Sequence, residues 1–164
     1  MTPASLVLIV LATTILMEGV AWALHRFVMH GPLWCLHRSH HQPRRGLFEL
    51  NDVFGLFFSI ASMILIYLGL RGYPALLGIG LGLVCYGCVY FFLHDVLVHR
   101  RVRLPIVPRH GYLRHLYQAH HLHHATHGRD GAVSFGFAYA PPIARLKRAL
   151  VTGGNRPPRE ADRD

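Results

Sequence analysis

The sequence is poor in acidic residues and in cysteine. Only 8 of its 164 residues are Asp or Glu, against 17 Lys and Arg, and only 3 are Cys. Cys85 and Cys88 lie in an apolar stretch with no second pair to complete a zinc site, so we expect them to pack as small apolar side chains. The sequence contains no P-loop, dinucleotide-binding glycine motif or nucleophile elbow. Any reducing equivalents that the protein needs must therefore come from another protein.

Apolar residues, in contrast, are abundant and grouped. They make up 52% of the chain, and residues 3 to about 24, 53–70 and 74–93 form three runs. Each run is long enough to cross a hydrocarbon core of about 30 Å as a helix. We predict an all-α fold, a polytopic membrane helical bundle. At this length we expect one membrane-embedded domain over residues 1–152 and a polar, disordered tail over residues 153–164.

Two features within these runs bear on helix packing. Glu18 is the only charged residue in them, and a buried carboxylate is costly. We expect it to be protonated or hydrogen-bonded between helices, and a functional role is the alternative. Gly78, Gly80 and Gly82 form a small-residue face that lets another helix approach closely, either from this chain or from a second subunit.

The basic residues are distributed unevenly about the runs. Arg71 lies in the short turn between the second and third runs, and the other 16 of the 17 Lys and Arg lie on the opposite side. The positive-inside rule places that side in the cytoplasm. This pattern favours a lipid bilayer over nucleic acid as the partner of the basic residues. We expect phospholipid contacts from Arg44, Arg45, Arg100, Arg101 and Arg103.

Ten of the 14 histidines fall into four groups that repeat one order of spacing. An H-x4-H pair is followed by an H-x2-HH triplet, and this order occurs twice along the chain. The charge pattern places all four groups at the cytoplasmic border. The groups are His25 and His30; His37, His40 and His41; His94 and His99; and His120, His123 and His124.

This pattern predicts a metal centre in a His-rich cytoplasmic cap. The members of each triplet share one helix face, whereas residues five apart lie about 140° apart and need a bulge, a helix end or a broad cluster. Ten imidazoles are too many for one ion, so we expect two ions, and imidazole alone leaves iron, copper, nickel and zinc open. His110, His115, His121 and His127 fall outside the pattern.

Polar residues beside these groups are candidates to hold the imidazoles in place. Asp95 follows His94, and Glu49, Asn51 and Asp52 precede the second run. Carboxylates beside ligating imidazoles commonly accept the second ring N–H. Alternatively, Asp52 caps the second helix and Glu49 is solvated.

Five segments together closely resemble the bacterial β-carotene hydroxylases of the fatty-acid hydroxylase superfamily. They are HRFVMHGPLWCLHRSHH (25–41), ELND (49–52), YFFLHDVLVHRR (90–101), GYLRHLYQAHHLHH (111–124) and GRDGAVSFGFAYAPP (128–142). The resemblance implies a non-haem di-iron monooxygenase of the bacterial inner membrane. It would use two Fe²⁺ ions, O2 and electrons from a ferredoxin-type donor to hydroxylate β-carotene at C3 of each β-ionone ring, forming β-cryptoxanthin and then zeaxanthin. The ten histidines are the implied iron ligands, with no catalytic residue beyond the metal cluster.

Several points stay open at this level. The family commonly has four spans, so a fourth would be interfacial or follow His99. The substrate channel is predicted to be lined by phenylalanines, for which ordinary packing is the alternative: Phe54, Phe57, Phe58, Phe91 and Phe92. Another lipid hydroxylase, a desaturase or a carotenoid ketolase would have the same metal core. A metal transporter and a bis-His haem protein are more remote alternatives. A transporter would place its ligands near the midplane of the membrane, and a bis-His haem site would leave the histidine triplets unused.

Overall fold

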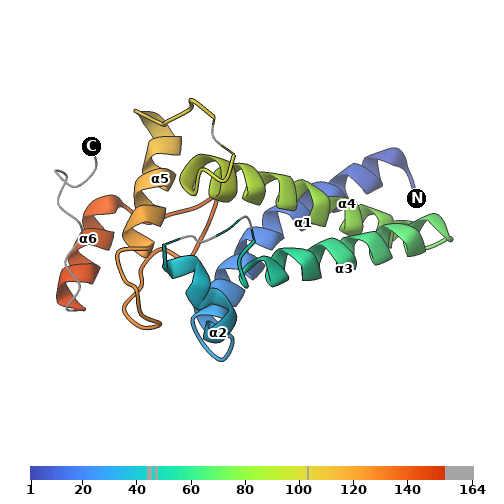
Figure 1. Ribbon diagram of the computed structural model, residues 1–164. Coiled ribbons are helices and arrows are strands. Elements are labelled where there is room, and N and C mark those ends of the chain that lie inside the picture. The colour runs from blue at the N-terminus through green and yellow to red at the C-terminus, as the bar shows by residue number, and fades with distance from the viewer. Residues whose placement is uncertain (44–45, 47, 103, 154–164) are drawn as a thin grey trace.

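The computed structural model describes residues 1–43, 46, 48–102 and 104–153, and every regular element in this part of the chain is helical (Figure 1). The predicted all-α fold is confirmed. The predictions for Arg44, Arg45, Arg103 and residues 154–164 lie outside the described residues. In chain order, the elements are α1 (Pro3–Ala23), η1 (Leu24–Met29), α2 (Trp34–His37), η2 (Arg38–His41), α3 (Asp52–Leu70), α4 (Pro74–Tyr90), η3 (Phe91–Val98), α5 (Gly111–His123) and α6 (Ile143–Thr152).

Among the described residues, three continuous helices are long and apolar enough to cross a membrane, as predicted. They cover Pro3–Met29, Asp52–Leu70 and Pro74–Val98. The first and third extend beyond the predicted ends at residues 24 and 93, because α1 passes directly into η1 and α4 into η3. The N-terminus and the turn between α3 and α4 lie together at one end of the molecule, and α5 and α6 lie at the other (Figure 1).

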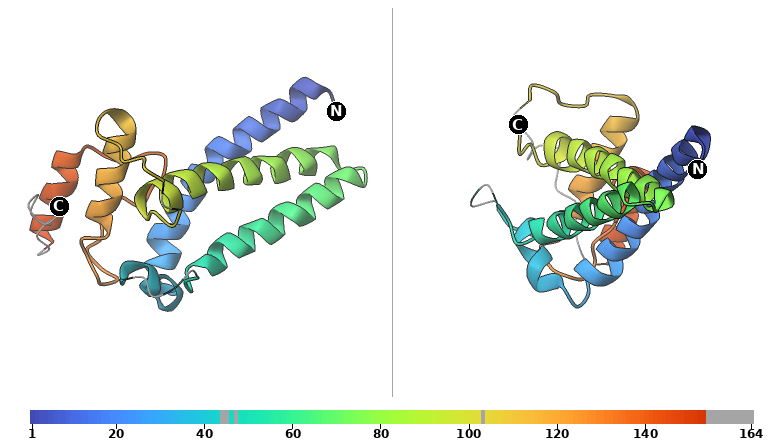
Figure 2. Two further views of the ribbon diagram at one scale, coloured as in Figure 1. Left: turned by 45° about the horizontal axis from the view of Figure 1, so that its top comes forward. Right: turned by 90° about the vertical axis from the view of Figure 1, so that its right-hand side faces the viewer.

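Helix α4 lies between α1 and α3 and packs against both (Figure 2). Its glycines make this possible. A Cβ at Gly82 would lie 2.5 Å from the Cβ of Thr13 on α1, and a Cβ at Gly80 would lie 2.8 Å from Cγ1 of Ile66 on α3. The small-residue face therefore serves packing within this chain.

The α3–α4 connection is the tight hairpin that the sequence predicts. Only residues 71–73 separate the helices, and Gly72 has a φ of 115°, a conformation that favours glycine. Pro74 begins α4 at a position where its missing N–H costs nothing.

At the other end, α5 and α6 form a cap that packs around a small apolar core. Leu122 of α5 and Leu150 of α6 are almost fully buried in it, and Leu146 of α6 packs beside them. Helix α6 is a ten-residue amphipathic helix, and the segment before it, residues 124–142, contains no regular element. No fourth membrane-spanning helix is found in the described part of the chain.

Candidate metal centre

The two H-x4-H pairs lie on π-helical turns at the C-terminal ends of the first and third spans. The backbone N–H of His30 donates to the carbonyl of His25 at 3.0 Å, and that of His99 donates to His94 at 2.9 Å. These i→i+5 bonds bring together residues that an α-helix would hold about 140° apart. The ring centroids consequently lie only 5.2 Å apart in the first pair and 4.5 Å apart in the second. Of the three arrangements that the spacing allows, the chain adopts the bulge.

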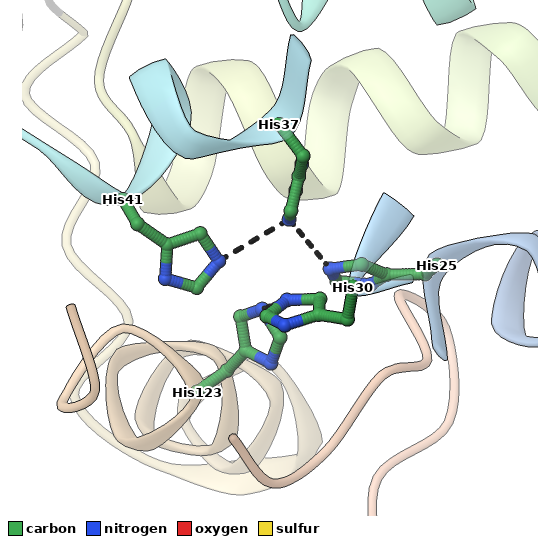
Figure 3. A group of neighbouring side chains, drawn as sticks. All are labelled: His25, His30, His37, His41 and His123. Atoms are coloured by element: carbon green, nitrogen blue, oxygen red, sulfur yellow. Dashed lines mark hydrogen bonds between the residues drawn. The ribbon is translucent and has the colours of Figure 1, made fainter. Parts of the chain in front are cut away.

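Five imidazoles converge in a first group (Figure 3). One nitrogen from each ring lies within 4.8 Å of the others. The Nε2 atom of His37 lies 3.1 Å from that of His25 and 3.2 Å from that of His41. The rings come from η1, the α2–η2 segment and α5. The members are His25, His30, His37, His41 and His123.

The second group is built in the same way from the remaining pair and triplets. His40, His94, His99 and His120 also place one nitrogen each within 4.8 Å of one another. Nε2 of His124 lies 2.9 Å from Nε2 of His120, which adds a fifth ring. His124 also lies beside His41, with ring centroids 4.5 Å apart, so the two groups adjoin. All ten histidines of the repeated pattern thus come together in two adjacent groups of five.

The Nδ1 atoms, which point away from the other imidazoles, contact backbone carbonyls, and these contacts show which ring nitrogens carry protons. Nδ1 of His30 donates to the carbonyl of Arg129 at 2.8 Å, and Nδ1 of His123 donates to that of Val133 at 3.0 Å. A carbonyl can only accept, so in the neutral rings both Nε2 atoms carry lone pairs. These two atoms are nevertheless 3.2 Å apart. Two lone pairs at that distance repel unless a cation lies between them.

Burial keeps these rings neutral. It lowers the pKa of His37 to about 3 and that of His41 to about 4. Burial, together with neighbouring imidazoles, also lowers the pKa of His120 and His123 well below the usual value. At neutral pH the inward-facing nitrogens are therefore free to bind metal, and protonation does not relieve their mutual repulsion.

The spacing of the inward nitrogens fits a shared ion. At a metal–nitrogen distance of about 2.1 Å, neighbouring ligands of one ion lie roughly 3.0–3.4 Å apart. The Nε2 pairs in the two groups are separated by 2.9–3.2 Å. An all-imidazole donor set suits iron, copper, nickel or zinc. The residues therefore fit two transition-metal ions.

The polar residues that the sequence places beside the histidines have two different roles. Asn51 accepts from Nδ1 of His37 at 2.7 Å through its side-chain oxygen, and Glu49 accepts from Nδ1 of His40 at 2.9 Å. Asp95 accepts from Nδ1 of His94 at 2.8 Å. Asp52 accepts from the backbone N–H of Glu49 and pairs with an arginine. Three of the four thus contact imidazoles, and Asp52 supports the loop that carries one of them.

Backbone carbonyls fill the same role for other histidines, and no sequence signal identified them. His25 donates Nδ1–H to the carbonyl of Phe135 at 2.8 Å, and His41 donates to that of Thr126 at 3.0 Å. Every residue has a backbone carbonyl, so residue type does not show which carbonyls accept from a histidine. The path of the segment after α5 determines this.

Arg101 is a correction to the sequence analysis. Its side chain is only 14% exposed, and its Nη2 lies 2.7 Å from Asp52 and 3.2 Å from Glu49, while Nε lies 3.5 Å from Asp95. The predicted phospholipid contact is therefore wrong for this residue. A largely buried guanidinium among three carboxylates compensates their charge, and two of those carboxylates orient histidines of the second group.

An apolar cavity of about 500 Å³ lies between α1, α3 and α4, beside the histidines. Phe54, Phe58 and Phe91 line it, whereas Phe57 and Phe92 are exposed and do not. Its volume falls within the usual range for small-molecule sites. Tyr90 and Phe137 also line it, and neither was among the predicted channel residues.

Glu18 is hydrogen-bonded between elements, as expected. Its Oε2 accepts from the hydroxyl of Tyr86 at 2.9 Å. Its Oε1 accepts from the backbone N–H groups of Phe137 and Ala138 at 2.9 Å and of Tyr139 at 3.1 Å. Four hydrogen bonds satisfy this carboxylate within the first span.

The four histidines outside the repeated pattern belong to neither group. His115 donates to the carbonyl of Ala140, and His127 donates to that of His41. His121 contacts the ring of Tyr117, and His110 is exposed.

The family model for fatty acid hydroxylases matches residues 10–141. A "Beta-carotene hydroxylase" of Paracoccus sp. (strain PC1) is 50% identical over 148 residues, which are 90% of this chain and 91% of that protein. One from Pantoea ananas is 50% identical over 143 residues, 87% of this chain and 82% of its own length. The "Beta-carotene 3-hydroxylase 2, chloroplastic" of Arabidopsis thaliana is 41% identical over 73% of this chain and 40% of its own length. No solved structure matches the chain significantly.

Proposed function

The chain belongs to the fatty acid hydroxylase family, and we propose that it hydroxylates β-carotene at C3 of each β-ionone ring, giving β-cryptoxanthin and then zeaxanthin. The observation that supports this most strongly is the placement of two five-histidine groups at the inner end of an apolar cavity between membrane-spanning helices. The bacterial and plant relatives named above are also hydroxylases of this substrate.

We propose two iron ions as the metals that the histidines hold. Iron bound there would supply the activation of O2 that insertion into an unactivated C–H bond requires. The overall reaction replaces one C–H by C–OH, reduces the second oxygen atom to water, and consumes two protons and two electrons from an external donor. Family membership supports iron over the other metals that imidazole suits, and the all-imidazole donor set is compatible with iron.

The protein's own residues would bind and orient the substrate. A C40 polyene dissolves in the bilayer, so it would enter sideways between the helices. Phe91 and Val84 line the cavity and are 48% and 42% exposed, so the cavity wall reaches the surface that faces lipid. Alignment of one ring carbon within about 3–3.5 Å of the oxidant can supply much of the rate enhancement.

We further propose that the histidine groups lie on the cytoplasmic side of a bacterial inner membrane and that the electrons come from a ferredoxin-type carrier. The uneven distribution of Lys and Arg supports this orientation. An acidic carrier would be attracted to the same basic side.

Expression in a host that accumulates β-carotene tests the proposal. Chromatography and mass spectrometry of the pigments should show β-cryptoxanthin and zeaxanthin, and the purified protein should contain iron. A 4-keto product would indicate a ketolase, and a new double bond a desaturase. Unchanged β-carotene despite membrane insertion and iron loading would contradict the proposal.

A further inference from the structure

The wall of the apolar cavity nearest the histidines includes an aromatic side chain that touches both histidine groups. Phe137 lines the cavity and is buried. Its ring is parallel to that of His25 in the first group, with centroids 5.3 Å apart and an angle of 5°. It meets the ring of His94 in the second group edge-on, also at 5.3 Å. No histidine lines the cavity itself. A molecule in the cavity therefore meets Phe137 and Tyr90, whose ring lies 4.6 Å from that of His94, before it meets the imidazoles. Of these two aromatic residues, Phe137 has ring contacts with both histidine groups.

The backbone of Phe137 is held by Glu18. One carboxylate oxygen, Oε1, accepts from three consecutive backbone N–H groups, those of residues 137–139. Gly136 fits into this contact because a Cβ there would lie 2.8 Å from the same oxygen. The segment around Phe137 contains no regular element, so these bonds replace the ones that a helix or sheet would provide.

The position of the Phe137 ring thus determines how far a substrate ring can advance toward the metal centre. Neighbouring carbons of a saturated ring lie only about 1.5 Å apart. A displacement of that size would present the adjacent carbon instead, and misplacement by about 1 Å can change a rate by roughly 100-fold. We propose that Phe137 is the residue that selects C3 for hydroxylation, and that Glu18 is the positioning residue that holds Phe137 in place. This inference rests on the proposed function.

The first test replaces the wall itself. Wild type and Phe137→Ala are expressed in β-carotene-producing cells, the hydroxyl position in each product is assigned by NMR, and iron is determined on the purified proteins. Phe137→Ala should keep its iron and raise the yield of products hydroxylated away from C3 by about tenfold. Phe58→Ala is the matched control, because Phe58 lines the same cavity from α3 and has no ring contact with a histidine. It should lower the yield while leaving the hydroxyl at C3.

The second test addresses Glu18. Glu18→Leu removes the acceptor and should shift the hydroxyl position as Phe137→Ala does. The double variant should shift it no further than Phe137→Ala alone. Glu18→Gln retains a carbonyl oxygen and should retain C3. Tyr86→Phe is the matched control, since the Tyr86 hydroxyl binds the other carboxylate oxygen and should not affect the hydroxyl position. If Glu18→Leu does not accumulate, Glu18→Asp, which withdraws the carboxylate by one methylene, should give a smaller shift in the same direction.

The outcomes separate the two proposals. If the iron-loaded wild type makes no hydroxylated carotenoid, the proposed function fails. If the wild type makes zeaxanthin and iron-loaded Phe137→Ala still hydroxylates only C3, the role of Phe137 is overturned. If Phe137→Ala shifts the hydroxyl position and neither Glu18→Leu nor Glu18→Asp does, the role of Glu18 is overturned.

Discussion

Replacing Glu49 by Gln should weaken iron retention because Glu49 orients a histidine of the second group. Its Oε2 accepts from Nδ1 of His40 at 2.9 Å, and the side chains of both residues are nearly buried. Loss of such a partner typically costs 10- to 100-fold in metal affinity, which corresponds to about 1.4–2.8 kcal/mol. Gln keeps the size of the side chain and one acceptor oxygen but loses the negative charge that favours the Nδ1–H form of the ring.

Asp52→Asn is the matched control for this experiment. Asp52 carries the same charge and pairs with the same Arg101, yet its carboxylate contacts that arginine and the backbone N–H of Glu49 rather than a histidine. Both variants therefore lose one carboxylate next to Arg101, and only Glu49→Gln loses a negative charge that contacts His40. The assay is iron remaining per chain after equilibration with graded chelator concentrations. Equal retention by Glu49→Gln and Asp52→Asn would refute the reasoning.

Three further changes have expected outcomes. Gly82→Val should lower the free energy of unfolding by about 1–3 kcal/mol, because a Cβ at Gly82 would lie 2.5 Å from Cβ of Thr13. Thermal unfolding in detergent measures the change. Gly19→Val is the control, because a Cβ at Gly19 would have no neighbouring atom within 4 Å. The pKa of His37 is lowered to about 3, so this ring is protonated at a lower pH in the folded state than in the unfolded state. As pH falls from about 6.5 to 3, this ring should lower the free energy of unfolding of the metal-free protein by up to roughly 1.4 kcal/mol per pH unit. A Tm that does not fall on acidification would argue against a buried neutral imidazole. His123→Ala should abolish zeaxanthin formation while the protein still inserts in the membrane, and full turnover would remove it from the proposed ligands.

The fold could be predicted largely from chemistry that is local in the sequence. Apolar length identified the three spans, and the charge pattern placed the two pairs and the two triplets of histidines at the same end. The spacing of His25 and His30 required a bulge, a helix end or a broad cluster, and only the coordinates distinguish among them. The first and third spans also run about five residues further than hydropathy indicated, because their π-helical turns continue into polar sequence.

The partners of the histidines were predictable only where a side chain supplies the acceptor. Glu49, Asn51 and Asp95 stand out as polar residues beside the pattern, and each accepts from an imidazole. The carbonyl of Phe135 and the aromatic wall at Phe137 depend on how residues 124–142 fold back over the site, and no periodicity marks that path. Arg101 was assigned to lipid because exposed arginines at a membrane border usually contact headgroups. Its three carboxylate partners come from segments distant in sequence or from the preceding π-helical turn.

We propose that the ten imidazoles of the repeated pattern hold a pair of irons. Elemental analysis of protein purified from zeaxanthin-producing cells, with pigment turnover measured on the same preparation, tests it most directly. The account predicts close to two irons per chain in active material and loss of activity as iron is removed. Active protein that contains a single iron per chain, or another metal in its place, would contradict it.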